Sequence, residues 1–156
     1  MNPVRIRLAA AGDEPGLVAV VADLIAEDPG TRDPSVSQQW PHRFGLSSMK
    51  TWMADTNWLV LAATDGEAIV GILTGFLTEP TDYRPVRIAT LHSLYVNPAY
   101  RDGGVGAQLV AKVRSWARNR QAQRMSVTAY AANTDAIRFY QRHAFTPRLL
   151  ELDGEP

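Results

Sequence analysis

The chain contains no cysteine. This absence excludes a disulfide framework, a zinc site built on thiolates and a cysteine nucleophile. Long hydrophobic runs are also missing, because the longest, Leu17 to Ala26, is too short to span a bilayer and contains Asp23. The first residues do not read as a signal peptide, and a cytoplasmic protein is therefore expected.

Signatures of several other function classes are absent as well. The three histidines, His42, His92 and His143, lack the spacing of metal ligands, so no metal is expected. No Gly-x-Ser-x-Gly elbow is present that would carry a covalent acyl intermediate. The chain has no block of like charge and no basic stripe interleaved with aromatic residues, so neither nucleic acid nor a membrane is an expected partner.

The length and the charge of the chain suggest one domain with an anionic ligand. The 156 residues fit a single domain, residues 1–156, that is long enough to bury a core. Residues 1–82 carry 5 basic and 11 acidic side chains, whereas residues 83–156 carry 11 basic and 5 acidic ones. A basic half suits an anionic ligand, although chance clustering of solvated charges would give the same count.

The most informative segment of the chain is His92–Gly106. An apolar run ends at Asn97-Pro98, a glycine-rich loop follows, and from Val105 apolar residues recur at helical spacing. A strand, a glycine loop and a helix together present bare backbone N–H groups at a helix N-terminus, where the helix dipole adds about half a positive charge. Glycine also lacks the Cβ that would keep an oxygen anion away. The segment therefore predicts a site for a phosphate-bearing cofactor.

The order of the elements predicts an α/β fold. Strands are expected at residues 4–8, 58–64, 68–77, 87–96, 125–130 and 145–152. Helices are expected at 13–28, 105–119 and 134–143, and an irregular helical segment, interrupted by Pro41 and Gly45, at 35–55. A turn at Asp65-Gly66 joins the second and third strands into a hairpin. This order is typical of a mixed, mostly antiparallel central sheet flanked by helices on both faces.

Two motifs stand in the C-terminal half of the chain. The first is Leu94-Tyr95-Val96-Asn97-Pro98-x-Tyr100-Arg101-x-x-Gly104-Val105-Gly106, and the second is Asn133-x-x-Ala136-x-x-Phe139-Tyr140 followed by Phe145. With the element order, they resemble the GNAT superfamily of acetyl-CoA-dependent N-acetyltransferases, whose signature Gln/Arg-x-x-Gly-x-Gly/Ala is met by Arg101, Gly104 and Gly106. The match covers residues 89–146, and the N-terminal half agrees in element order only. The resemblance implies the acyl-CoA N-acyltransferase fold, with acetyl-CoA as the cosubstrate.

The resemblance also implies a role for each matching residue. Backbone groups of Leu94 and Val96 would pair with the pantetheine arm as an added strand would. Asn133 would contact the cofactor arm, and Tyr140 would be the general acid that protonates the leaving thiolate. The amides from Arg101 to Gly106 would hold the pyrophosphate. The implied cofactor-binding set is Leu94, Tyr95, Val96, Arg101, Asp102, Gly103, Gly104, Val105, Gly106 and Asn133.

Some of these assignments have alternatives, and two residues depart from the family pattern. The side chain of Arg101 is either a phosphate ligand or a charge that caps the loop, and Tyr140 would otherwise be a core residue. The position after Arg101 is often Gly in the family and is Asp102 here, whose carboxylate would repel a pyrophosphate unless it turned outward. Ala144 replaces the usual Gly before the closing Phe, which changes the turn out of the last helix.

Acetyl transfer from a thioester to an amine needs a neutral amine and therefore a base. His92 is the candidate because it titrates near neutrality, at a place where many family members have a Glu. Strand alternation is expected to place His92 on the same face as Leu94 and Val96. Glu79 and water are the alternatives to His92, which would otherwise be a hydrogen-bonded core residue or a substrate-positioning residue.

The function expected from the sequence is transfer of an acetyl group from acetyl-CoA to a primary amine of a small molecule, by direct attack in a ternary complex. The alternatives are acetylation of a protein N-terminus or lysine, and a catalytically silent acyl-CoA-binding sensor. A dinucleotide-binding enzyme is disfavoured because Gly-x-Gly-x-x-Gly does not occur at the loop. The family resemblance also makes a homodimer a possible assembly.

Overall fold

The computed structural model describes residues 3–156 and contains one five-stranded sheet in the order β1-β2-β3-β4-β5. The strands are β1 (Arg5–Leu8), β2 (Trp58–Asp65), β3 (Ala68–Thr78), β4 (Ile88–Val96) and β5 (Arg124–Val127). Neighbours from β1 to β4 are antiparallel, and β4 and β5 are parallel. The predicted mixed, mostly antiparallel sheet is therefore confirmed.

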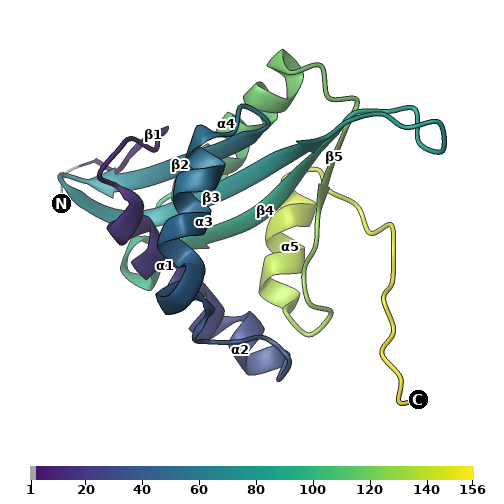
Figure 1. The fold of residues 1–156 in the computed structure, drawn as a ribbon, viewed down its shortest axis with the longest axis horizontal. Helices are drawn as coiled ribbons and strands as arrows, with labels where there is room; N and C mark the ends of the chain where they lie inside the picture. Colours follow the sequence, from purple (N-terminus) through teal and green to yellow (C-terminus); the bar gives the residue numbers. More distant parts are fainter. Residues whose placement is uncertain (1–2) are drawn as a thin grey trace.

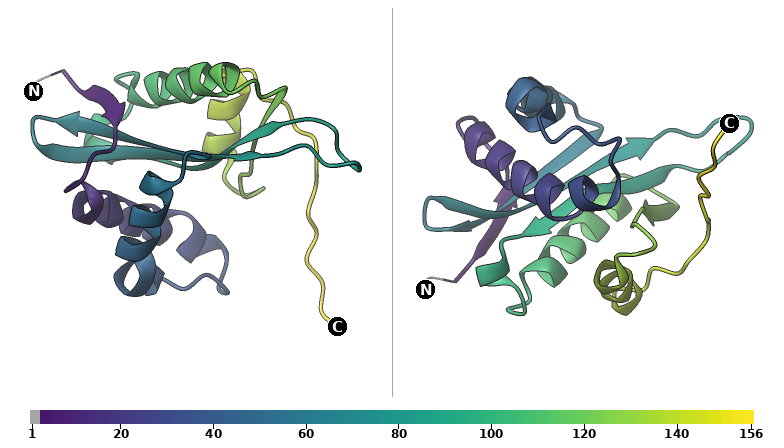
Figure 2. Two further views of the ribbon diagram at one scale, coloured as in Figure 1. Left: turned by 45° about the horizontal axis from the view of Figure 1, so that its top comes forward. Right: turned by 90° about the horizontal axis from the view of Figure 1, so that it is seen from below.

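Helices cover both faces of this sheet. They are α1 (Glu14–Glu27), α2 (Pro29–Arg32), α3 (Leu46–Ala54), α4 (Val105–Asn119) and α5 (Thr134–Arg142), with a π-helical turn η1 (Pro41–Gly45) and a 3₁₀ turn η2 (Pro98–Tyr100). Figure 2 shows α1, α2 and α3 on one face and α4 on the other. The helical segment expected at 35–55 is interrupted around Pro41 and Gly45, as expected from these two residues, and regular α-helix begins at Leu46. No helix formed by residues 3–156 is long and apolar enough to cross a membrane.

The core has two layers that the sheet separates. On one face, the apolar stripe of α4 packs on the sheet, with Leu109 and Val113 fully buried. On the other face, Leu17 and Val21 of α1 pack with Met49 of α3 against the alternate residues of the same strands. Full burial of a side chain of this kind contributes roughly 1.5–3 kcal/mol, so the two layers account for much of the stability.

A β-bulge interrupts β4 at His92. Thr74 of β3 lies opposite Ser93, but the next residue, Gly75, lies opposite Leu91, so His92 has no partner across the ladder. A bulge of this kind places two residues of one strand against one of its neighbour and reverses the alternation of side chains beyond it. The sequence pattern did not predict this irregularity.

The prediction of a strand over residues 145–152 is wrong. Residues 146–156 form neither helix nor strand, and Figure 1 shows this segment extending away from the sheet. Its leucines are largely exposed, with 83% for Leu149, 75% for Leu150 and 80% for Leu152. A strand needs a neighbour for its backbone groups, and the ladders of the single chain provide none for this segment.

Candidate active site

The strand β4 is paired with the parallel strand β5 over only part of its length. Their ladder joins Ile88–Leu91 to Arg124–Val127 and stops one residue before the bulge. Within residues 3–156, the part of β4 from Ser93 to Val96 has no strand beside it on the β5 side. Its backbone groups on that side can therefore pair with an extended ligand, as an added strand would.

The N-terminus of α4 lies just beyond the end of β4 and is open to an anion. Gly104 is the N-cap residue, with a φ of 80° and no side-chain cap. The first backbone hydrogen bond of the helix runs from the amide of Gln108 to the carbonyl of Gly104. The amides of residues 105–107 have no acceptor in the part of the chain that the structure describes. An added Cβ at Gly104 would meet nothing within 4 Å. These amides and the helix dipole fit a pyrophosphate.

Two neighbouring residues of the glycine loop have other structural roles. A Cβ at Gly106 would lie 3.1 Å from Cζ of Phe139, so glycine at this position lets α4 pack closely on α5. Asp102 has a φ of 63°, in the left-handed region that favours glycine and that Asp tolerates better than most residues. This backbone conformation accounts for an Asp at a position that is often Gly in the family.

Arg101 connects the glycine loop to α1. Its Nη2 donates to Oε2 of Glu27 at 2.7 Å, and its Nε donates to the carbonyl of Val96 at 2.8 Å. The guanidinium also lies 5.3 Å from the ring centroid of Tyr95. The hydrogen bond from Arg101 lowers the pKa of Glu27, which keeps the pair ionised. Because the side chain is engaged in this way, its binding to phosphate stays a prediction.

Asn133 begins α5 and bridges it to the end of α1. Its Oδ1 accepts from the amide of Ala136 at 3.1 Å, which caps the helix, and its Nδ2 donates to Oδ1 of Asp28 at 2.8 Å. Asp28 also accepts from Nε of Arg32 at 2.6 Å. Contact between Asn133 and the cofactor arm stays a prediction, and Asp28 is a residue that sequence reasoning missed.

Tyr140 lies on α5 in an aromatic group. Its ring centroid is 5.4 Å from that of Phe139 and 5.7 Å from that of Phe145. Burial, together with the negative charge of Asp28, raises the pKa of Tyr140 to about 12. Its hydroxyl has no hydrogen-bond partner among residues 3–156, so a protonated phenol is free to donate.

His92 lies in an aromatic cage formed by Trp52, Trp58 and Phe76. The centroid of the His92 ring is 5.5 Å from that of Trp52, 5.4 Å from that of Trp58 and 5.9 Å from that of Phe76. Nδ1 lies 3.3 Å from Oγ1 of Thr74 and 3.2 Å from Oγ of Ser93. The residue is exposed overall, but partial exclusion of water by the surrounding rings lowers the pKa of His92 below its usual value of 6.5.

The expectation that His92 shares a face with Leu94 and Val96 is wrong. Leu94 and Val96 pack in the layer of α4, whereas the cage around His92 belongs to the face of α1 and α3. The bulge at His92 causes this difference, because one extra residue reverses the alternation beyond it. The cage itself was missed, because it depends on the pairing of Trp58 with Phe76 and on a register shift between Ala63 and Thr64, which the sequence pattern did not predict.

Glu79, the alternative base, is held by an arginine. Nη2 of Arg87 lies 2.8 Å from Oε2 of Glu79, and Nε of Arg87 lies 3.1 Å from the same oxygen. This ion pair lies at the root of the loop between β3 and β4. The carboxylate of Glu79 is thus already engaged by two donors of one side chain, which favours His92 as the candidate base.

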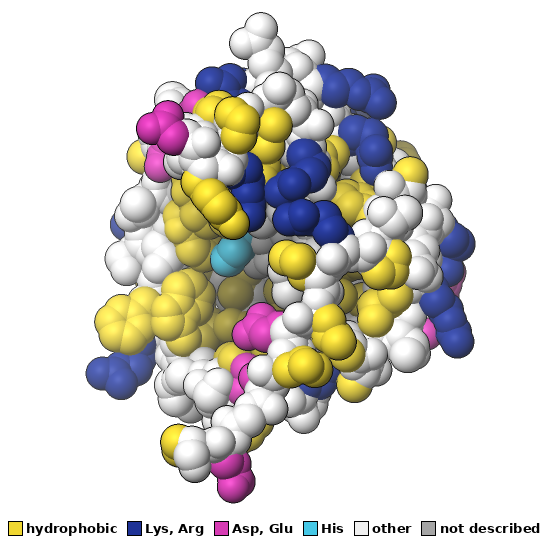
Figure 3. All heavy atoms as spheres, turned by 90° about the vertical axis from the view of Figure 1, so that its right-hand side faces the viewer, with side chains coloured by type: hydrophobic (Ala, Val, Ile, Leu, Met, Phe, Trp, Pro, Cys, Tyr) yellow, Lys and Arg dark blue, Asp and Glu magenta, His cyan; other side chains and the backbone are white. Residues whose placement is uncertain are grey.

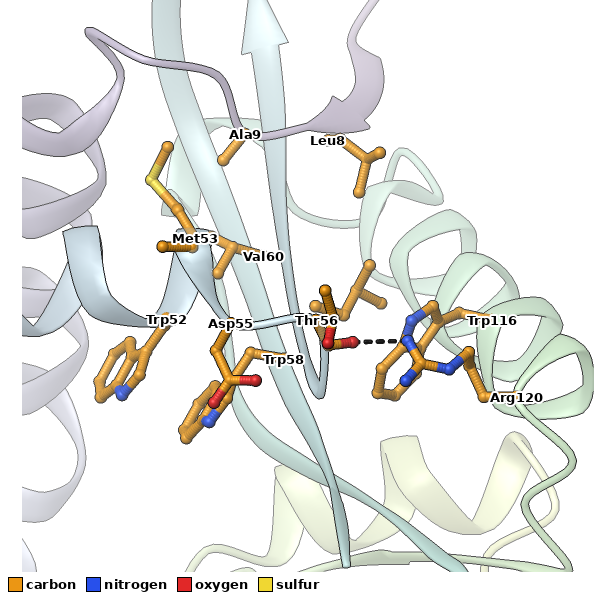
Figure 4. A pocket seen from close by; sticks show the side chains of 12 residues that line it. Leu8, Ala9, Trp52, Met53, Asp55, Thr56, Trp58, Val60, Trp116 and Arg120 are labelled. Carbon is orange, nitrogen blue, oxygen red and sulfur yellow. Dashed lines mark hydrogen bonds between the residues drawn. The ribbon is translucent and has the colours of Figure 1, made fainter.

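One face of the molecule is hollowed, and a pocket opens at the edge of the sheet. Figure 3 shows a face that is hollowed between hydrophobic side chains, with a histidine in the hollow and several Lys and Arg side chains gathered beside it. A pocket of about 360 Å³ lies between the ends of α3 and α4 at the edge formed by β1 and β2 (Figure 4). Trp52 and Trp58 line it, but no residue of β4 or of the glycine loop does, so it is not the predicted cofactor site.

Comparison with solved structures shows the same fold. A transcriptional regulator from Bacillus halodurans C-125 is 27% identical, with a TM-score of 0.79 over 98% of this chain and 99% of that one. AAC(6')-Iy, in complex with the bisubstrate analogue CoA-S-monomethyl-acetylneamine, is 18% identical, with a TM-score of 0.74 over 99% and 100%. The aminoglycoside acetyltransferase meta-AAC0020, from an uncultured soil metagenomic sample, is 18% identical, with a TM-score of 0.73 over 98% and 95%.

Comparison at the level of sequence identifies the family. No curated protein matches the chain significantly. The model of the acetyltransferase (GNAT) family matches residues 21–145, which include both motifs, the bulge in β4 and the N-terminus of α4. The chain therefore belongs to the GNAT family of acetyltransferases, whose cosubstrate is acetyl-CoA.

Proposed function

We propose that the chain is an N-acetyltransferase that moves the acetyl group of acetyl-CoA to a primary amine of a small molecule, by direct attack in a ternary complex. The observation that carries this proposal is the separation of β4 from β5 beyond Leu91, with the uncapped N-terminus of α4 at the end of the same strand. An amide-rich arm and a pyrophosphate are the two parts of coenzyme A that these backbone groups suit.

Bound acetyl-CoA supplies a thioester whose carbonyl carbon the amine attacks. Backbone groups of Leu94 and Val96 would orient the arm, although the carbonyl of Val96 also accepts a hydrogen bond from Arg101. The amides at the start of α4 would hold the pyrophosphate. The chain has no cysteine, so an acyl-thioenzyme intermediate is excluded and direct attack is the simpler route.

His92 and Tyr140 would handle the two protons of the reaction. A primary amine is protonated at neutral pH, and His92, which is neutral there because its pKa is lowered, would accept that proton directly or through water. Tyr140, whose phenol remains protonated, would give a proton to the thiolate as coenzyme A leaves. The nitrogen loses a second proton as the amide forms, and this proton would restore the phenol of Tyr140. The products are the acetylated amine and coenzyme A with a free thiol, and the proton accepted by His92 passes to water.

The acceptor would enter from the face of α1 and α3. His92 projects there, and Trp52, Trp58 and Phe76 form an apolar wall around it. An apolar wall with a few polar groups is typical of a site for a small molecule. The fold shared with two aminoglycoside acetyltransferases supports a small-molecule acceptor.

The test is release of coenzyme A thiol from acetyl-CoA across a panel of small amines, peptides and lysine-containing proteins. We expect turnover with at least one small primary amine and none without an acceptor. Turnover confined to the peptides or proteins would instead assign a protein acetyltransferase. Saturable binding of acetyl-CoA without turnover on any acceptor would contradict the enzymatic proposal.

Binding of acetyl-CoA without turnover would favour a second candidate function, that of a catalytically silent sensor of acyl-CoA. The observation behind it is the 27% identity to the protein from Bacillus halodurans that is described as a transcriptional regulator. A sensor needs the cofactor site but not the two proton-transferring side chains. The variant Tyr140→Phe separates the two, because a sensor would bind acetyl-CoA unchanged and have no turnover to lose.

A further inference from the structure

The sheet register places an arginine of β5 on the same face as the aromatic cage. Phe76 of the cage pairs with Thr90, which in turn pairs with Ser126, and paired residues of neighbouring strands project from the same face. The distance of 3.1 Å between Oγ1 of Thr90 and Oγ of Ser126 agrees with this arrangement. Because side chains alternate along a strand, Arg124, two residues before Ser126, projects from that face as well.

The side chain of Arg124 carries a positive charge without a partner. Its Nε is buried without a hydrogen-bond partner, and none of the ion pairs formed within residues 3–156 includes it. Arg124 pairs with Ile88, whose partner on β3 directly precedes Glu79, but Arg87 already holds that carboxylate through two hydrogen bonds. A buried donor without an acceptor is costly, and a bound anion would supply the missing oxygen.

Other basic side chains add to this charge. Figure 3 shows Lys and Arg side chains gathered on one side of the hollow that contains a histidine, and acidic side chains on the other side. Burial lowers the pKa of Arg124, and so do the positive charges of Arg148 and Arg84. Like charges brought together in this way repel one another, and an anion bound among them would relieve the repulsion.

Arg124 is not placed to hold the pyrophosphate of coenzyme A. It lies beside Ile88, the first residue of β4, whereas the uncapped N-terminus of α4 lies beyond the last residue, Val96. The strand rises by about 26 Å between these two ends. His92 lies between them, so a molecule that brings an amine to His92 from the acceptor side can extend toward Arg124.

We propose that the acceptor is a small amine that also carries an acidic group, a carboxylate or a phosphate, and that Arg124 binds this group while the amine lies beside His92. This inference rests on the proposed N-acetyltransferase function and narrows its substrate class. Thr90 and Ser126, which lie on the same face between the two ends of such a molecule, offer hydroxyl groups to it. A molecule with several positive charges and no acidic group would instead be repelled by Arg124.

The first experiment compares amines that differ only in the acidic group. Release of coenzyme A thiol from acetyl-CoA is measured with γ-aminobutyrate against butylamine, O-phosphoethanolamine against ethanolamine, and each common α-amino acid against its amide. We expect kcat/KM to be at least about tenfold higher for an acidic amine than for its neutral counterpart, and the carboxylate and phosphate arms show which group is preferred. Equal or faster turnover of the neutral amines, or of spermidine, would overturn the proposal and leave the acetyltransferase function intact.

The second experiment removes the charge of the arginine. Arg124→Gln should raise KM for the acidic amine at least about tenfold, and should leave KM for its neutral counterpart and Kd for acetyl-CoA unchanged. Unchanged turnover of the neutral amine shows that the variant is folded. Arg124→Lys keeps the charge and should retain part of the affinity. Arg5→Gln, in β1 at the opposite edge of the sheet, is the matched control. Equal KM values for the acidic amine in wild type and Arg124→Gln would refute the role of Arg124.

Binding measured without turnover separates this proposal from the proposed function. Calorimetry in the presence of coenzyme A measures binding of γ-aminobutyrate, O-phosphoethanolamine and the α-amino acids directly. Binding that is lost in Arg124→Gln, together with no acetylation by the wild type, would support the site for the acidic group and contradict the acetyltransferase function. Absence of binding of every acidic amine to the wild type would overturn the site itself.

Discussion

At the scale of single residues, His92 and Tyr140 have pKa shifts in opposite directions. Partial burial keeps the imidazole of His92 neutral, because its charged form loses water. Burial and the nearby Asp28 keep the phenol of Tyr140 protonated. A base that is already deprotonated and an acid that is still protonated are the states in which an amine and a thioester could react at neutral pH.

Removing the phenolic hydroxyl of Tyr140 tests its proposed role as the general acid. Tyr140→Phe should lower kcat about 10²–10⁴-fold, the usual contribution of a general acid, and should change KM for acetyl-CoA little. Steady-state kinetics measures both. Tyr83→Phe is the control, because Tyr83 is 92% exposed and the same change there should be silent. Turnover at the wild-type level in Tyr140→Phe would exclude the assignment.

The pH dependence of the rate tests the proposed role of His92 as the general base. His92 must be neutral to accept a proton, so kcat/KM should fall as the pH drops through a pKa below 6.5. His92→Gln should lower the rate and abolish this acid limb. A limb that persists in His92→Gln would assign it to another group.

The lowered pKa of His92 also predicts that the free energy of unfolding depends on pH. Because the pKa of His92 is lower when folded, the unfolded chain binds more protons between that pKa and 6.5. The contribution of the neutral imidazole is therefore present above 6.5 and is lost as the pH falls through this window. Urea unfolding at several pH values should show a steeper loss for the wild type than for His92→Gln, and equal slopes would contradict the shift.

At the scale of elements, periodicity predicts some segments well and others poorly. The stripe of α4 packs as its helical spacing indicates, because Val105, Leu109 and Val113 contact only one layer. The bulge at His92 depends on pairing with β3, which alternation along a single strand does not reveal. The polar contacts of Asn133 and Arg101 depend on helices far away in sequence, so motif spacing could not predict them.

The start of α5 gives a test at this scale. Asn133→Ala removes the cap on the amide of Ala136 and the bond to Asp28, and should cost about 0.5–2 kcal/mol of the free energy of unfolding. Asn133→Ser retains a capping oxygen but cannot reach Asp28 in the same way, so it should lose less. Urea unfolding measures both, and equal losses would show that the cap contributes nothing.

At the scale of the whole molecule, the sheet would separate the two substrates of the proposed reaction. The helices α4 and α5 and the glycine loop form the side that suits the cofactor, while α1, α3 and the cage around His92 form the side that suits the acceptor. The two sides meet at the part of β4 beyond Leu91, because β5 no longer pairs with β4 there. In the proposed reaction, acetyl-CoA and the amine would therefore approach the bulge from opposite faces.

Binding of the cofactor should stabilise the whole fold. At a concentration of acetyl-CoA 100 times its Kd, linkage predicts about 2.7 kcal/mol. For a chain of this size that corresponds to a rise in Tm of roughly 5–11 °C. Thermal unfolding with acetyl-CoA measures the shift, and NAD at the same concentration should give none. Stabilisation by NAD alone would contradict the cofactor assignment.

The bulge in β4 has a consequence for how the chain tolerates changes in length. If His92 were deleted, Ser93 would follow Leu91 directly, and the ladder with β3 would close without a gap. Every other side chain of β4 would keep its present face, because Leu91 and Leu94 already lie on the same one. The loss of a single codon would therefore leave a more regular sheet that lacks the candidate base, so the fold does not require this extra residue.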